Sequence, residues 1–95
     1  MYTCVAYDIS SNRVRLLAAK WCKRIGLVRL QRSVFTGKVP AADIAEMEQE
    51  LRSMLAKTDK LVILPLDKAT YCVLLRQSDN ERLKQLQDAF TIYDL

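Results

Sequence analysis

The sequence predicts an α+β domain whose elements run strand, helix, strand, strand, helix, strand. Three observations lead to this prediction. The chain opens on a short apolar run, 1–7, that is rich in β-branched and aromatic residues. Two segments, 14–25 and 44–55, repeat apolar residues at helical spacing. Short apolar or alternating runs lie between and after them, at 27–39 and 60–66.

Composition places the chain among ordinary globular domains. Its 95 residues suffice for one domain with a modest core, and 51% of them are hydrophobic. Lysine and arginine number 15 against 11 aspartate and glutamate residues, which gives a net charge of +4. A mildly basic domain suits a polyanionic partner such as nucleic acid.

Histidine is absent from the sequence, and three cysteines have no metal-binding spacing. The lack of histidine excludes Ser-His-Asp, Cys-His and imidazole-base chemistry. Cys4, Cys22 and Cys72 are expected to be reduced, buried small hydrophobes, which indicates a cytoplasmic protein. Neither an apolar run long enough to span a membrane nor a secretory signal is found, so no membrane association is expected.

Asp8 ends the first predicted strand and is the first candidate functional residue. A carboxylate at the end of a buried strand lies where the sheet meets solvent, a common place for ligand-contacting groups. The alternative interpretation is that Asp8 only begins the turn or caps the next helix.

The first helix is expected to follow a capping cluster at 10–12 and to stop at Gly26. Its apolar face comprises Val14, Leu17, Ala18, Trp21, Cys22 and Ile25. Arg13 and Arg15 lie in its first turns, where the helix dipole favours acidic residues. That placement is explained by a nearby bound anion or, equally, by an ordinary solvated basic face.

The segment 27–39 changes the phase of its alternation near Arg32. We expect two strands, 27–31 and 34–39, joined by a tight turn, with one long bulged strand as the alternative. Arg29 and Arg32 then place cations in or beside the sheet, where they either aid solubility or meet phosphate oxygens.

Pro40 suits the first position of a second helix that carries apolar residues up to Leu55 and an acidic, solvated face. Thr58 and Asp59 are expected to break it. The run 60–67 is apolar almost throughout and predicts a central strand that begins at Lys60 and ends at Pro65, and 71–75 predicts a further strand.

The last part of the chain gives weaker signals. Ser78 and Glu81 have the spacing of a capping box before a short helix, and 90–93 could form a last edge strand. We therefore expect a single domain, 1–95, with a core at 1–66 and a C-terminal extension at 67–95.

This order is that of the split βαβ, or ferredoxin-like, fold. Two helices would cover one face of the sheet and leave the other apolar face exposed. A second copy of the chain is the simplest cover, so a homodimer is expected.

Three segments of the sequence together resemble a known family. The sequence Tyr-Asp-Ile at 7–9, an arginine-bearing helix closed at Gly26, and the segment Arg-Leu-Gln-Arg-Ser-Val-Phe-Thr-Gly at 29–37 together resemble the CRISPR-associated protein 2 family. The resemblance covers about residues 1–66.

The resemblance implies a ferredoxin-like homodimer in which the matching aspartate, Asp8, meets its twin across the two-fold axis. The pair is expected to bind a divalent metal, usually Mg²⁺, and to be catalytic in cleavage of RNA or double-stranded DNA. The remaining matched positions are supporting residues Tyr7, Ser33 and Phe35 and nucleic-acid-binding residues Arg13, Arg15 and Arg29. Arg32, in the same segment as Arg29, is a further candidate for nucleic-acid binding. The resemblance also implies a CRISPR-associated integrase as partner in spacer acquisition, with the dimer bridging integrase dimers along the captured duplex.

Two further interpretations remain open beside a metal-dependent endonuclease. The dimer could be a non-catalytic scaffold that binds the duplex backbone through its arginines, with Asp8 structural. It could also be a regulatory ferredoxin-like dimer that binds another protein. The residues do not choose between RNA and DNA as the substrate.

Overall fold

The computed structural model describes residues 1–76, in which strands and helices alternate in nearly the predicted order. The elements are β1 (Tyr2–Asp8), α1 (Asn12–Ile25), β2 (Val28–Gln31), β3 (Val34–Lys38), α2 (Ala41–Arg52), β4 (Lys60–Leu66) and α3 (Lys68–Arg76). Up to β4 this is the predicted ferredoxin-like succession.

The four strands form one antiparallel sheet in the order β2-β3-β1-β4. A turn at 32–33 separates β2 from β3, so the prediction of two strands is confirmed and the single bulged strand is not formed. This order confirms the predicted ferredoxin-like fold. It makes β1 central and β4 an edge strand, whereas 60–66 was expected to be central.

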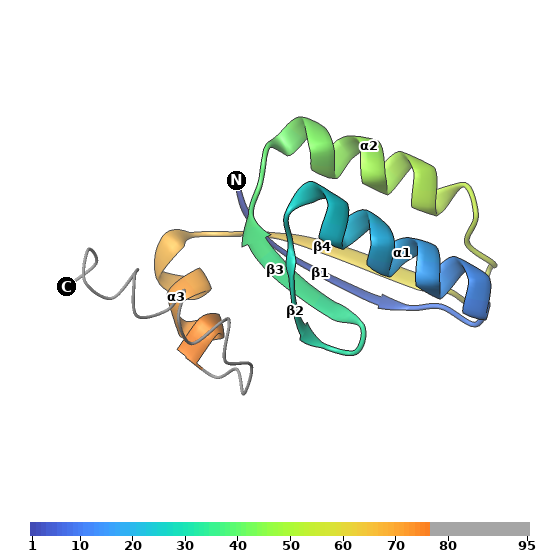
Figure 1. The fold of residues 1–95 in the computed structure, drawn as a ribbon, viewed down its shortest axis with the longest axis horizontal. Helices are drawn as coiled ribbons and strands as arrows, with labels where there is room; N and C mark the ends of the chain where they lie inside the picture. Colours follow the sequence, from blue (N-terminus) through green and yellow to red (C-terminus); the bar gives the residue numbers. More distant parts are fainter. Residues whose placement is uncertain (77–95) are drawn as a thin grey trace.

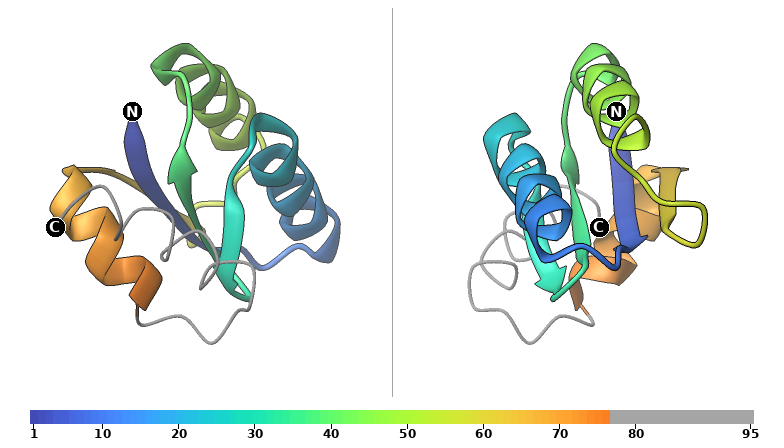
Figure 2. Two further views of the ribbon diagram at one scale, coloured as in Figure 1. Left: turned by 60° about the vertical axis from the view of Figure 1, so that its left-hand side comes forward. Right: turned by 90° about the vertical axis from the view of Figure 1, so that its right-hand side faces the viewer.

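Two layers of helix lie on opposite faces of the sheet. Figure 1 and the turned views of Figure 2 show α1 and α2 side by side on one face, with α3 on the other side near the end of β4. Side chains of β1 alternate between these faces. Val5 and Tyr7 enter the core beneath α1 and α2, while Tyr2 packs against Tyr71 of α3, with ring centroids 4.9 Å apart.

Both ends of α1 form as the sequence predicts. The Ser11 hydroxyl accepts a hydrogen bond from the Val14 amide at 3.3 Å and so caps the first turn. Gly26 adopts the left-handed conformation, with φ 105°, and the Leu27 amide donates to the Cys22 carbonyl at 2.9 Å. Glycine permits this reversal because it has no Cβ to clash.

The predicted bounds of α2 are wrong at both ends. Pro40 stands one residue before the helix, as an extended N-cap whose carbonyl accepts from the Asp43 amide at 3.1 Å. The helix ends at Arg52, and the Ser53 hydroxyl donates to the Glu50 carbonyl at 2.6 Å, which gives a partner to a carbonyl of the last turn. Met54 and Leu55 follow it and still pack against the core.

The strand predicted at 71–75 is also wrong, since these residues belong to α3. Asp67 caps this helix through a 2.7 Å hydrogen bond from the Thr70 amide to its carboxylate. Tyr71 and Leu75, one helical turn apart, are both buried against the sheet. A five-residue apolar run does not distinguish a strand from a buried helical face. In addition, β4 continues past Pro65 to Leu66, because an edge strand tolerates proline.

The three cysteines are free thiols. Cys22 lies in the core, where burial raises the pKa of its thiol to about 12 and keeps it neutral. Cys72 is a buried residue of α3, and Cys4 is partly buried on the sheet. In the described part of the chain, 1–76, no helix has the length and apolar character needed to cross a membrane. The helix after Ser78 and the strand at 90–93 lie outside the described residues.

Candidate functional site

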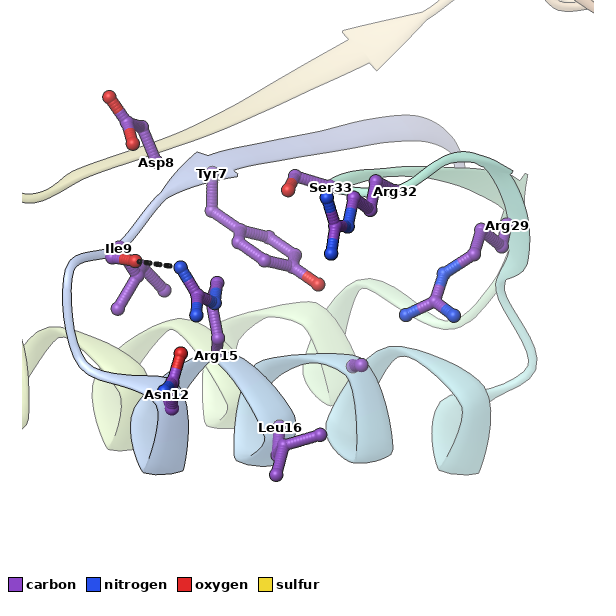
Figure 3. A pocket seen from close by; sticks show the side chains of 10 residues that line it. Tyr7, Asp8, Ile9, Asn12, Arg15, Leu16, Arg29, Arg32 and Ser33 are labelled. Atoms are coloured by element: carbon purple, nitrogen blue, oxygen red, sulfur yellow. Dashed lines mark hydrogen bonds between the residues drawn. The ribbon is translucent and has the colours of Figure 1, made fainter.

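Asp8 stands at the end of β1 with an exposed side chain. Because side chains alternate along a strand, its carboxylate lies on the opposite side of the sheet from the buried Tyr7 ring. Figure 3 shows the two side chains pointing apart from the same strand. Ser11, not Asp8, caps α1, and no hydrogen bond engages the Asp8 carboxylate within residues 1–76. The carboxylate is therefore available to a ligand.

On the helical side of β1 a hollow of about 670 Å³ opens between α1 and the turn that joins β2 to β3. It is lined by Tyr7, Asp8, Ile9, Asn12, Arg15, Leu16, Ala19, Arg29, Arg32 and Ser33. Asp8 lies at its rim. Predicted site residues from three separate segments thus meet around one cavity.

Three guanidinium groups make this hollow electropositive. Arg15 donates from Nη1 to the Ile9 carbonyl at 3.3 Å, and Arg29 lies 5.0 Å from the centre of the Phe35 ring. Arg32 reaches the hollow from the turn. Guanidinium groups gathered around one hollow suit phosphate oxygens, which they bind in pairs of hydrogen bonds.

Tyr7 forms the floor of the hollow. Its ring is buried and stacks on Phe35 at a centroid distance of 6.3 Å, and its amide donates to the Ser33 carbonyl at 3.1 Å. Burial raises the pKa of the Tyr7 hydroxyl, although a hydrogen bond with Arg29 and the charge of Arg15 act in the opposite direction. The hydroxyl stays protonated at neutral pH, so it can donate a hydrogen bond and is a poor base.

Arg13 does not line the hollow, unlike Arg15. Residues two apart on a helix point to different sides, so the pair could not act together from α1. The helix face that does meet the hollow carries Asn12, Leu16 and Ala19, which the sequence analysis did not select. The available signal was the helical spacing: Asn12 and Ala19 lie three and four residues from Arg15, and Leu16 lies four and three residues from Asn12 and Ala19.

Within residues 1–76 the sheet face that carries Asp8 is only partly covered. Val62 and Leu64 of β4 are 46% and 51% exposed, and Cys4 and Ala6 lie beside them on β1. The contacts of α3 are with residues at the far end of β1 and β4 and with β2, namely Tyr2, Leu66, Val28 and Leu30. An apolar surface, here called the open face (Cys4, Ala6, Val62, Leu64), therefore remains between α3 and Asp8.

Asp59 ties the loop after Asp8 to the start of β4. Its Oδ1 accepts hydrogen bonds from the Ser10 amide and hydroxyl, both at 3.0 Å, and its Oδ2 accepts from the Ala56 amide at 2.9 Å. The amides of Ala56 and Ser10, in that order, lower the pKa of the Asp59 carboxyl below its usual 3.8. The ionised carboxylate thus fixes the end of β1 next to β4.

This clamp predicts an acid-sensitive contribution to stability. A carboxyl whose pKa is lower in the folded state stabilises the fold above its unfolded value, and that contribution is lost as pH falls through the folded value. We expect Asp59→Asn to lower the thermal midpoint at pH 7, and the difference from wild type to shrink as the pH is lowered from neutral through the acidic range. Thermal melts across this range measure it. Glu50→Gln, at an exposed position of α2, is the control, and an equal difference at every pH would contradict the prediction.

Comparison with known proteins shows the family to which this chain belongs. Residues 1–73 match the family described as CRISPR associated protein Cas2. The chain belongs to the Cas2 family. Over 77 residues it is 36% identical to a CRISPR-associated endonuclease Cas1/endonuclease Cas2 fusion of Thermoproteus tenax, a match that covers 80% of this chain and 29% of the fusion.

Other Cas2 proteins agree with this assignment. The CRISPR-associated endoribonuclease Cas2 2 of Pyrobaculum aerophilum is 42% identical over 52 residues, or 55% of this chain and 57% of that protein. The crystal structure of Streptococcus pyogenes Cas2 superposes with a TM-score of 0.63 at 28% identity, covering 72% of this chain and 88% of that one. The chain thus spans less than two thirds of the length of the first two relatives.

Proposed function

We propose that this Cas2-family chain acts as a homodimeric, Mg²⁺-dependent endonuclease on RNA or double-stranded DNA during CRISPR spacer acquisition. The observation that carries the proposal is the Asp8 carboxylate, exposed beside an apolar open face and aimed away from the basic hollow. The names of the relatives support it, since they are called endonuclease or endoribonuclease. The Cas1/Cas2 fusion supports an integrase as partner.

A second copy of the chain is the proposed occupant of the open face. Val62 and Leu64 are large apolar side chains, about half exposed, on a β-sheet, which pack well against an equivalent sheet. The face includes β4, an edge strand that has no further strand paired to its outer side within residues 1–76. A two-fold axis through this surface would place Asp8 of both copies at its border.

The donor chemistry of Asp8 fits Mg²⁺. This ion prefers carboxylate oxygens, needs few protein ligands and keeps several waters. Within residues 1–76 no three candidate ligands of the histidine, cysteine or carboxylate type lie together. One chain therefore supplies a single carboxylate, and a second copy supplies the other. When bound, Mg²⁺ would lower the pKa of a water and offset charge on the reacting phosphate.

The other side chains would bind and position the substrate. Arg15, Arg29 and Arg32 offer phosphate contacts, and the protonated Tyr7 hydroxyl offers a hydrogen bond. Since the sequence contains no histidine, proton transfer from the attacking water cannot use an imidazole.

The direct test is cleavage of end-labelled single-stranded RNA and of duplex DNA by the purified chain. We expect products in Mg²⁺ and none in excess chelator. Cleavage that persists in chelator would contradict metal dependence, and the absence of cleavage of either substrate would contradict the endonuclease proposal.

The position of the arginines favours a second candidate, a non-catalytic scaffold for duplex DNA. They occupy the helical side of the sheet, whereas the Asp8 carboxylate lies on the other side. A backbone-binding surface that does not include the carboxylate is what a scaffold requires.

The double variant Arg15→Ala, Arg29→Ala tests the role of this surface. Binding is expected to weaken by roughly tenfold or more at low salt, with a less steep dependence of affinity on salt because fewer counterions are released. Fluorescence anisotropy with a labelled duplex measures both. Lys20→Ala, at an exposed position of α1 outside the hollow, is the control, and an unchanged salt slope in the double variant would remove the hollow from the interface.

A further inference from the structure

Lys60 lies directly opposite Asp8 in the sheet. The antiparallel register of β1 and β4 pairs these two residues at the last position of one strand and the first of the other. Side chains paired in this way extend from the same face, with Cβ atoms about 5 Å apart. The lysine, like the aspartate, is exposed. The Lys60 ammonium group therefore lies beside Asp8, the candidate metal ligand.

The two charges do not neutralise each other. No ion pair joins Asp8 and Lys60 within the described residues, and neither side chain makes another hydrogen bond there. A carboxylate alone repels a phosphodiester, which is itself an anion. An unpaired ammonium group within reach offsets that repulsion and leaves the carboxylate free for a metal.

The backbone around this pair is held in place. The Asp59 carboxylate, one residue before Lys60, accepts hydrogen bonds from Ser10, two residues after Asp8. The end of β1 and the start of β4 are thus connected on both sides of the pair, by the sheet and by this clamp. The position of Lys60 relative to Asp8 does not depend on a free loop.

We infer that Lys60 is a substrate-binding residue of the Asp8 site, whose ammonium group holds a phosphate of the RNA or DNA next to the Asp8 carboxylate. The inference rests on the proposed function for the identity of the ligand. It adds a contact on the face of the sheet that carries Asp8, opposite to the face on which the arginine hollow lies.

Binding without cleavage tests the inference. Labelled RNA and duplex DNA are titrated with wild type, Lys60→Met, Lys60→Arg and the control Lys57→Met in chelator. For Lys60→Met we expect roughly tenfold weaker binding and a slope of log K against log salt reduced by about one for each chain bound. Lys60→Arg should restore both quantities. Lys57 is exposed three residues earlier, and Lys57→Met should leave affinity and salt slope unchanged. Equal behaviour of Lys60→Met and Lys57→Met would overturn the inference.

A second measurement uses the unaltered protein. Amine acetylation followed by mass spectrometry compares Lys60 and Lys57 with and without the oligonucleotide. Protection of Lys60 alone is expected, and equal reactivity of both lysines in the two conditions would overturn the inference.

The two proposals fail separately. Wild type that binds without cleaving, together with weaker binding by Lys60→Met, would remove the endonuclease and keep the Lys60 contact. Cleavage by wild type with unchanged binding by Lys60→Met would keep the endonuclease and remove the Lys60 contact. If cleavage occurs, Lys60→Met should raise KM more than it lowers kcat, because the contact is already present in the bound substrate.

Discussion

Asp8→Asn is expected to reduce Mg²⁺-dependent cleavage by about a hundredfold or more, which corresponds to about 2.7 kcal/mol of transition-state stabilisation. The substitution keeps the size of the side chain and removes the negative charge that would hold the metal. The exposed carboxylate makes no hydrogen bond within residues 1–76, so the fold should be unaffected. Single-turnover cleavage of RNA and duplex DNA, with thermal melts alongside, measures both effects.

Binding separates the catalytic role of Asp8 from a structural one. Affinity for the uncleaved oligonucleotide in chelator should stay at or slightly above that of wild type, since a repulsive charge has been removed. Glu46→Gln makes the same chemical change at an exposed position of α2 and should retain full activity. Equal cleavage by Asp8→Asn and wild type would place the chemistry elsewhere or in a contaminant, and a lower melting temperature would indicate a structural residue.

Leu64→Asp is expected to convert the proposed dimer into monomers. Leu64 is 51% exposed in the single chain and lies at the centre of the open face, so a dimer through this face would bury it. Burying an unpaired carboxylate in an apolar interface costs several kcal/mol, so the dimer dissociation constant should rise by about a hundredfold or more. Sedimentation equilibrium across a range of protein concentrations measures this change.

Leu16→Asp provides a matched control for this change. Leu16 is 65% exposed on α1, in the layer on the opposite side of the sheet, and its substitution should leave the oligomeric state unchanged. Monomeric Leu64→Asp should also lose cleavage if two copies of Asp8 are needed. A variant that stays dimeric with full activity would show that the interface lies elsewhere.

The site was only partly predictable because two adjacent residues at the end of β1 point to opposite faces of the sheet. Asp8 and Tyr7 are adjacent in sequence, but alternation along β1 sends one to the open face and the other into the hollow. The sequence analysis selected the arginines as nucleic-acid-binding residues, but it could not place them relative to Asp8. Arg15, Arg29 and Arg32 meet instead around Tyr7, and Arg13 points away from them because it lies two residues from Arg15.

Local patterns were sufficient where one short-range interaction decides the structure. The cap of α1 by Ser11, its stop at Gly26 and the turn at 32–33 were all predictable, since each depends on residues within about five positions. The same reasoning failed at 71–75, where packing of Tyr71 and Leu75 against the sheet favours a helix.

The sequence by itself determined the ferredoxin-like order of elements, the basic character of the domain and the absence of histidine chemistry. Periodicity and capping residues encode the order of elements locally, and the composition alone gives the charge and the absence of histidine. Tertiary structure alone decided which charged groups are neighbours. The register of β1 against β4 brings Lys60 opposite Asp8, 52 positions away in the chain, and Asp59 secures that register through Ser10. Strand pairing is set by the packing of the whole sheet, so no local pattern could reveal this pair.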